Sequence, residues 1–296
     1  MSQLWRERLV GLAFLVPALL LFAVFIVYPI VYNVQASTLK WDGVNEGTFV
    51  GLGNYRELVA DPIFHRTLVN SALWIPLTII PQGLIGFLLA VALNQKLRGS
   101  TVYRALFFIP AILSPVVVGI VWQRIMDPFN GVLTQVGKAT GLGFLTNNYL
   151  SDPKTAIFAV IFVNVWMWTG FSMLFYLAGL QLIDPSVVEA ARIDGASGLQ
   201  TLTRITFPLL KSTTLSLVLL GIIGSLKTFE LVYVMTEGGP YHASEMLPTF
   251  AFLEAFKLQN VGYASAISMV LLVIAIVSSL SMVRVFGAGF MTGRDK

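Results

Sequence analysis

The stretch EAARIDGASG, residues 189–198, is small, polar and broken by glycine, and it lies between two long apolar runs. Asp184 and Pro185, shortly before it, are typical of a helix start, with the acid as N-cap and the proline in the first turn. Gly195 suits the left-handed conformation in which many helices end. We therefore predict a short helix from Pro185 that stops at a glycine turn.

A second short helix is expected directly after that turn. Ser197 followed by Gln200 predicts a capping box, and the helix is expected to run until Pro208, where the next apolar run begins. Each helix has about ten residues, which is too short to be stable alone in water. The segment 184–208, called the elbow below, is therefore either a solvated loop resting on the bilayer or a surface that packs against a partner.

The composition around the elbow is that of a membrane protein. The chain has 296 residues, of which 56% are hydrophobic and 11% charged, and its mean hydropathy is +0.79, whereas soluble domains have about 25% charged residues. A helix needs roughly 20 apolar residues to cross the hydrocarbon core. We predict an all-α, polytopic protein that forms a single transmembrane domain, with six spans at about residues 10–32, 69–93, 105–125, 156–180, 209–234 and 262–286. The third and fifth spans have the weakest boundaries, because they contain prolines and lysines respectively.

Positive charge sets the predicted orientation, since cytoplasmic segments of membrane proteins are enriched in lysine and arginine. With the N-terminus in the cytoplasm, eleven of the 19 basic residues fall in inner segments and seven in the longer outer loops, while Lys227 lies within a span. Both termini and the elbow are therefore predicted to be cytoplasmic. The mild net charge of +4 is explained by this asymmetry and does not indicate a surface for nucleic acid.

Several kinds of chemistry are disfavoured by the residues present. The chain has no cysteine and only two histidines, His65 and His242, far apart in sequence, so we expect neither a metal site nor a catalytic site. The nearest approach to a phosphate-binding loop is GVLTQVGKAT, residues 131–140, but it has one residue too many between its glycines and lacks the hydroxyl residue after lysine.

Polar side chains inside spans usually face a cavity or another helix, because they are expensive in lipid. Gln82, Asn164, Lys227 and Glu230 are such residues. The segment FVNVWMWTGF, residues 162–171, combines an amide with aromatic rings, a chemistry that suits sugars. Asn164 and Trp168 share a helix face because they are four residues apart. The candidate residues of a substrate path are Gln82, Asn164, Trp168, Phe171, Lys227 and Glu230.

Each of these residues also has a simpler interpretation. Tryptophans near the end of a span commonly anchor it at the membrane interface, and Asn164 could merely bond a neighbouring helix. Lys227 and Glu230, three residues apart, could form a local pair or extend toward the interface.

The elbow and its flanks carry a resemblance to a known family. EAARIDGASGLQTLTRITFPLL, residues 189–210, resembles the EAA loop of ABC importer permeases. FIPAILSPVVVGIVWQRIMDPFNGVL, residues 108–133, and KTFELVYVMTEGGP, residues 227–240, are similar to carbohydrate-uptake permeases of the maltose and glycerol-phosphate type, with the GGP ending favouring the maltose-F-like subunit. One departure is the short first outer loop, which lacks a large inserted domain. The EAA positions that match are Glu189, Ala190, Ala191, Gly195, Ile205 and Pro208.

This resemblance implies a type I importer permease fold in the inner membrane of a prokaryote. It implies binding-protein-dependent uptake of a sugar, with the elbow docked in a cleft of a cytoplasmic ATPase. Glu189 would be the anionic contact, Ala190 and Ala191 the closely approached face, and Gly195 the turn. Arg192 and Asp194 offer further charge for orientation.

The resemblance also implies a set of partners. These are a second, maltose-G-like permease, two ATPase subunits that hold ATP and magnesium, and an extracytoplasmic binding protein. This chain would then bind no cofactor and would not be an enzyme.

Other functions fit the six spans less well. A polyol or a glycerol-phosphate-type solute is an alternative to a sugar. A membrane enzyme would need ionisable groups that converge at one depth, and Lys227 with Glu230 is too little. A self-contained carrier often shows inverted repeats, and the sequence shows none.

Overall fold

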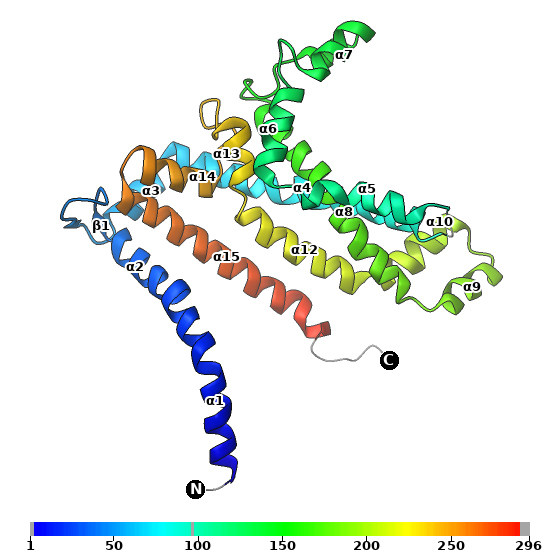
Figure 1. Ribbon diagram of the computed structural model, residues 1–296, viewed down its shortest axis with the longest axis horizontal. Helices are drawn as coiled ribbons and strands as arrows, with labels where there is room; N and C mark the ends of the chain where they lie inside the picture. Colours follow the sequence, from blue (N-terminus) through cyan, green and yellow to red (C-terminus); the bar gives the residue numbers. More distant parts are fainter. Residues whose placement is uncertain (1–2, 96–97, 291–296) are drawn as a thin grey trace. The chain divides into compact units, whose positions relative to one another are not determined.

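The computed structural model describes residues 3–95 and 98–290, and most of these residues are helical (Figure 1). The chain divides into two compact units. The first comprises Met1–Asp61 and Phe250–Leu272, and the second comprises Pro62–Thr249 and Val273–Lys296.

The first unit begins with a long apolar helical run. Within it, Phe14–Ser37 is long and apolar enough to cross a membrane, so this helix continues five residues beyond the predicted end of the first span. A two-stranded antiparallel ribbon and a short helix follow. The elements are α1 (Gln3–Phe22), a π-helical segment (Ala23–Val27), α2 (Tyr28–Ser37), β1 (Leu39–Lys40), β2 (Thr48–Phe49) and α3 (Gly53–Ala60).

Polar contacts close this unit. The Asn54 amide donates to the carbonyls of Ser37 and Leu39, both at 2.8 Å. The hydroxyl of Tyr263 donates to the Asp61 carboxylate at 2.7 Å. These hydrogen bonds join α3 to the end of α2 and to β1, and they join Tyr263 to Asp61 at the end of α3.

The second unit holds most of the helices. Its long helices are α4 (Pro62–Leu93) and α8 (Ala156–Gln181), and its shorter ones include bent and interrupted segments. The remaining elements are α5 (Ser100–Ile112), α6 (Pro115–Ile125), α7 (Val132–Thr140), a 3-10 turn (Gly143–Thr146), α9 (Pro185–Ile193), α10 (Gly198–Thr201), a π-helical segment (Leu202–Thr206), α11 (Phe207–Leu209), α12 (Lys211–Leu226) and α13 (Glu230–Thr236). Three elements are shared between the units or belong to the first. Helix α14 (Leu247–Phe252) begins in the second unit and ends in the first, a π-helical segment (Leu253–Lys257) belongs to the first, and α15 (Val261–Phe290) begins in the first and ends in the second.

Helix α8 is the centre of the second unit. It packs along α4 and also contacts α5, α12 and α13 (Figure 1). Glycines permit the closest approaches. A Cβ at Gly170 would lie 1.9 Å from the Phe107 carbonyl oxygen, and one at Gly86 would lie 2.7 Å from the Ser172 Cβ. Because α8 is apolar all round, it is buried among other helices.

The long apolar runs predicted as spans are helical in the structure, and the interrupted ones differ from the prediction. Among the described residues, four helices satisfy the length and hydropathy needed to cross a membrane, and two bent pairs raise the number to six if each pair is one span. The third span is two helices, α5 and α6, with a bend of 97° between them. The second bent pair is Gly198–Leu209 with Lys211–Leu226. The predicted fifth span, 209–234, is interrupted a second time, because α12 ends at Leu226 and α13 begins at Glu230. The second span begins at Pro62, seven residues earlier than predicted.

Candidate functional site: a membrane cavity and a polar elbow

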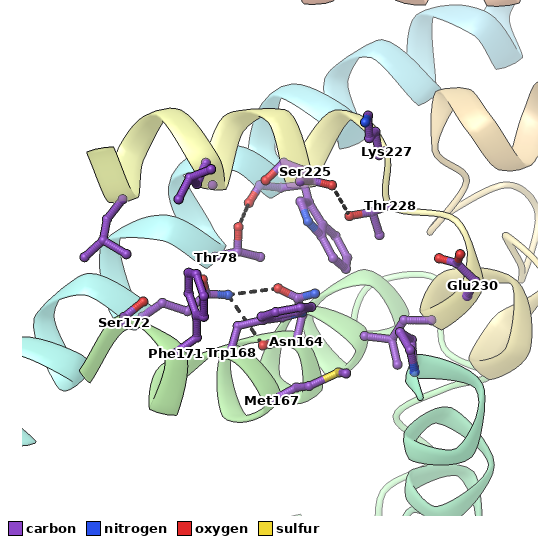
Figure 2. A pocket seen from close by; sticks show the side chains of 18 residues that line it. Thr78, Asn164, Met167, Trp168, Phe171, Ser172, Ser225, Lys227, Thr228 and Glu230 are labelled. Carbon is purple, nitrogen blue, oxygen red and sulfur yellow. Dashed lines mark hydrogen bonds between the residues drawn. The ribbon is translucent and has the colours of Figure 1, made fainter. Parts of the chain in front are cut away.

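A cavity of about 290 Å³ lies in the second unit, where α4, α8 and α12 meet the start of α13 (Figure 2). All of the residues that the sequence suggested for a substrate path line this one cavity. They come from three helices, α4, α8 and α13, and from the break between α12 and α13. These residues are Gln82, Asn164, Trp168, Phe171, Lys227 and Glu230.

Polar and aromatic side chains of α4 and α8 form one wall of the cavity. Gln82 Nε2 donates to Asn164 Oδ1 at 2.9 Å, so the two helices are joined through their amides. Asn164 thus bonds a neighbouring helix, as its simpler interpretation held, and it lines the cavity as well. Trp168 and Phe171 meet edge to face, with ring centroids 6.0 Å apart. This wall can offer amide hydrogen bonds beside aromatic faces.

The opposite wall is built by the interruption of the fifth span. The backbone N–H of Lys227 bonds back to the Gly224 carbonyl, and the Thr228 hydroxyl donates to the same carbonyl at 3.1 Å. Backbone that is not helical is tolerated at membrane depth where it lines a water-filled cavity or is buried in protein. The break therefore belongs beside the cavity, where its polar groups are satisfied.

Lys227 and Glu230 do not form the local ion pair that their spacing allows. An ion pair further along the described chain joins His242 to Glu245, with 3.1 Å between Nδ1 and Oε2, but none joins Lys227 to Glu230. The interpretation of Lys227 and Glu230 as a local pair is wrong, because the chain is unwound between them and carries them apart (Figure 2).

Sequence reasoning missed several residues of the cavity. Trp74 and Thr78 precede Gln82 at intervals of four on α4 and share its face, and the spacing from Gln82 could have identified them. Ser225 and Thr228 carried no such signal, because hydroxyl residues in spans commonly bond their own helix, as Thr78 bonds the Trp74 carbonyl at 2.8 Å.

The first half of the elbow has the local structure that its sequence predicts. The Asp184 carboxylate accepts the Ser186 backbone N–H at 2.9 Å as the N-cap of α9, and this bond holds the pKa of Asp184 below its ordinary value of 3.8. Gly195 has φ +82°, in the left-handed region. The capping box of Ser197 and Gln200 is present in both directions, at 2.8 and 3.3 Å.

The second half is helical up to Pro208, as predicted, but the helix is not regular. Gly198–Leu209 is one helical stretch, made of α10, a π-helical segment that contains Ile205, and α11, which contains Pro208. A bend of 66° separates Gly198–Leu209 from Lys211–Leu226. A proline removes one N–H donor from the ladder, and the wider turn before Pro208 accommodates this loss.

The exposed face of the elbow combines charge with apolar side chains. Glu189, Arg192 and Asp194 are exposed, and so is Ala190. Ala191 is 7% exposed, so the prediction that both alanines form one approachable face is wrong for Ala191, since consecutive helix residues point about 100° apart.

Exposed leucine and isoleucine side chains around the elbow were missed from the sequence. Leu182, Ile193 and Leu199 are 88%, 86% and 71% exposed. Glu189 and Arg192 also line a hollow of about 850 Å³ between the elbow and the ends of α4 and α8. This surface is apolar and hollowed, and it lies on two helices that are too short to be stable alone. Exposed apolar surfaces of this kind are typical of sites that another protein covers.

The described residues contain no group of three or more histidine, aspartate or glutamate side chains that could hold a metal ion.

Residues 82–286 match the family of binding-protein-dependent transport system inner membrane components. The chain belongs to this family.

Members of the family align with nearly the whole chain. The probable ABC transporter permease protein YurN of Bacillus subtilis is 38% identical over 96% of this chain and 98% of its own length. The multiple sugar-binding transport system permease protein MsmF of Streptococcus mutans is 33% identical over 92% of this chain and 93% of its own. A solved bacterial ABC transporter that imports the acidic polysaccharide alginate contains a chain with the same fold, with a TM-score of 0.83, 22% identity and coverage of 96% of this chain and 98% of that one. The type I importer permease fold expected from the sequence is thereby confirmed.

Proposed function

We propose that this chain is the permease subunit of an ATP-driven, binding-protein-dependent importer for a sugar or oligosaccharide. The observation that carries the proposal is the cavity, because it places Trp168 and Phe171 beside the Gln82–Asn164 amide pair. Sugars present apolar ring faces for stacking and hydroxyls for amide hydrogen bonds. The similarity to MsmF, a multiple sugar-binding transport system permease protein, supports the same solute class.

The elbow is proposed as the contact with a cytoplasmic ATPase. Its exposed Glu189 and Arg192 supply charge for orientation, and the exposed Ile193 and Leu199 supply apolar area that a partner would bury. A small helix in a cleft transmits motion because packed interfaces have discrete arrangements. ATP and magnesium belong to the ATPase in this proposal, and this chain performs no chemistry.

The remaining partners follow from the family and from the orientation. A second permease completes the translocation path, an extracytoplasmic binding protein delivers the solute, and two ATPases dock from the cytoplasm. With both termini cytoplasmic, the elbow faces the ATPases and the loops at 38–61 and 237–246 face the binding protein.

The substrate role of the cavity is tested by removing one aromatic face. In the assembled complex reconstituted in liposomes, with the binding protein outside and ATP inside, Trp168→Ala is expected to lower sugar uptake at least about tenfold. The reason is that a buried aromatic side chain contributes about 1.5–3 kcal/mol, and about 1.4 kcal/mol is a factor of ten in rate. Trp166→Ala, an exposed tryptophan of the same helix that does not line the cavity, is the matched control. Uptake that survives Trp168→Ala unchanged would contradict a sugar site in this cavity.

The docking role of the elbow is tested by charge reversal. Glu189→Lys is expected to leave insertion and pairing with the second permease intact, but to release the ATPases during purification and to abolish uptake. Glu46→Lys, on the first outer loop, makes the same charge change away from the elbow. Undiminished uptake by Glu189→Lys would count against ATPase docking at this residue.

A further inference from the structure

Two charged side chains, Lys227 and Glu230, lie among the described residues that line the cavity, and its lining contains no arginine. They flank the break in the fifth span, because Lys227 caps α12 and Glu230 begins α13. Figure 2 shows Lys227 above Thr228, and Glu230 farther along the chain. Neither forms an ion pair with another residue in the described part of the chain. The cavity lining therefore carries one positive and one negative side chain that do not contact each other.

An ionised group within a membrane span is costly unless it faces water or a partner. Because both groups face the cavity and do not bond each other, their hydrogen-bonding capacity is available to a solute. An ammonium donates up to three hydrogen bonds and a carboxylate accepts several. Hydroxyl groups can satisfy both, since they donate to Glu230 and accept from Lys227, and such charge-assisted bonds are stronger than neutral ones.

An anionic solute meets a different balance. Lys227 attracts a phosphate or uronate group, but Glu230 repels it at the same cavity wall. Protein sites for anions typically supply a surplus of positive charge, often from the forked guanidinium of arginine. The amides of Gln82 and Asn164 can donate hydrogen bonds but carry no charge, so they do not offset the repulsion by Glu230. This chain therefore gives no net attraction to an anion.

We propose that the transported solute is an uncharged carbohydrate, and that Glu230 is the specificity-determining residue that rejects uronates, sugar phosphates and glycerol phosphate. The proposal rests on the function proposed above and narrows its solute class. Lys227 keeps the cavity neutral and binds hydroxyl oxygens, while Glu230 accepts hydroxyl hydrogens and excludes negative charge.

Direct binding to the assembled complex tests this, because the binding protein would otherwise select the solute first. The complex of both permeases and both ATPases, in lipid nanodiscs without binding protein or nucleotide, is titrated with maltotriose, trigalacturonate and glycerol 3-phosphate. Saturation-transfer NMR gives each dissociation constant. The variants are Glu230→Gln and Lys227→Gln, with Glu46→Gln as a control for the same charge change on an exposed residue of the first outer loop.

The wild-type complex is expected to bind maltotriose at least about tenfold more tightly than either anion, the size of effect that one partly screened charge produces. Glu230→Gln should narrow that ratio about fivefold by improving anion binding. Lys227→Gln should widen it, and Glu46→Gln should leave it unchanged. Equal or tighter binding of the anions by the wild type overturns the inference, and so does a ratio that Glu230→Gln does not change.

The same measurements distinguish failure of the proposed sugar transport from failure of the proposed anion exclusion. If maltotriose does not bind, or if its binding survives Trp168→Ala, the probe does not occupy this cavity, and both the sugar site and the inference fall. If maltotriose binding is lost in Trp168→Ala while trigalacturonate competes equally well, the sugar site stands and the exclusion of anions by Glu230 is wrong.

Discussion

Substitutions at Gly195 and Gly198 in the elbow distinguish the effect of backbone conformation from the effect of steric crowding. A methyl group added at either would meet nothing within 4 Å. Gly195 has φ +82°, whereas Gly198 begins α10. A side chain in the left-handed region costs roughly 1–2 kcal/mol, so substitution at Gly195 is strained although there is room.

We therefore expect Gly195→Ala to slow ATP-driven uptake several-fold and Gly198→Ala to leave it near the wild-type rate. Gly195→Asn should be milder than Gly195→Ala, because asparagine tolerates this conformation better. Uptake rates and amide hydrogen exchange across residues 190–200 measure the effect. Equal losses at both glycines would show that the turn conformation is not what matters.

Asp184 gives the elbow a pH dependence whose sign follows from its cap. The bond from the Ser186 N–H holds the pKa of Asp184 below its ordinary value of 3.8, so the cap is present in full above pH 3.8 and is lost as the pH falls through the lowered value. Amide exchange at residues 185–188 should accelerate over that acid range. Asp184→Asn should remove this dependence while keeping the cap, and Asp184→Ala should give fast exchange at every pH.

At the scale of elements, the long apolar runs were predictable and the breaks were not. Helix α8 spans Ala156–Gln181 against a prediction of 156–180, because an uninterrupted run leaves little choice. No proline marks the break after Leu226. Hydropathy averaged over a whole span does not detect three residues that are not helical. Pro115 does mark the break in the third span, but the bend of 97° depends on packing that the sequence does not show.

The candidate site was predictable to a similar degree. Asn164 and Trp168 were assigned to one face from their spacing alone, and the structure places both at the cavity. The burial of Ala191 was not predictable, since it depends on how α9 lies on its own chain. The exposure of Ile193 was equally unpredictable, because a single apolar residue between charged ones gives no periodic signal.

The packing of α5 on α8 depends on Gly170, where a Cβ would lie 1.9 Å from the Phe107 carbonyl oxygen. Gly170→Ala should force the helices apart and lower the thermal stability of the complex, with a cost of about 1–3 kcal/mol for overpacking. Gly224→Ala is the stability control, because a Cβ there meets nothing within 4 Å. Equal melting temperatures for the two variants would contradict close helix contact at Gly170.

At the scale of the whole molecule, one helix connects the two candidate sites. Helix α8 carries Asn164 and Trp168 at the cavity, and it ends at Gln181, three residues before the Asp184 cap of the elbow. A rigid helix can carry displacement from one site to the other without intermediate loops. This connection requires the cavity to lie at membrane depth and the elbow to lie on the cytoplasmic side.

The predicted orientation is open to a direct test, because the chain has no cysteine and any introduced thiol is unique. Val44 in the first loop and Leu199 in the elbow are 83% and 71% exposed. In intact cells, an impermeant maleimide should label Val44→Cys and leave Leu199→Cys unlabelled until the membrane is opened. Co-assembly with the ATPases should then slow labelling of Leu199→Cys in open membranes, because a docked subunit covers it. Labelling of Leu199→Cys from outside intact cells would place the elbow on the face where no ATPase can reach it, and the proposed coupling would be excluded.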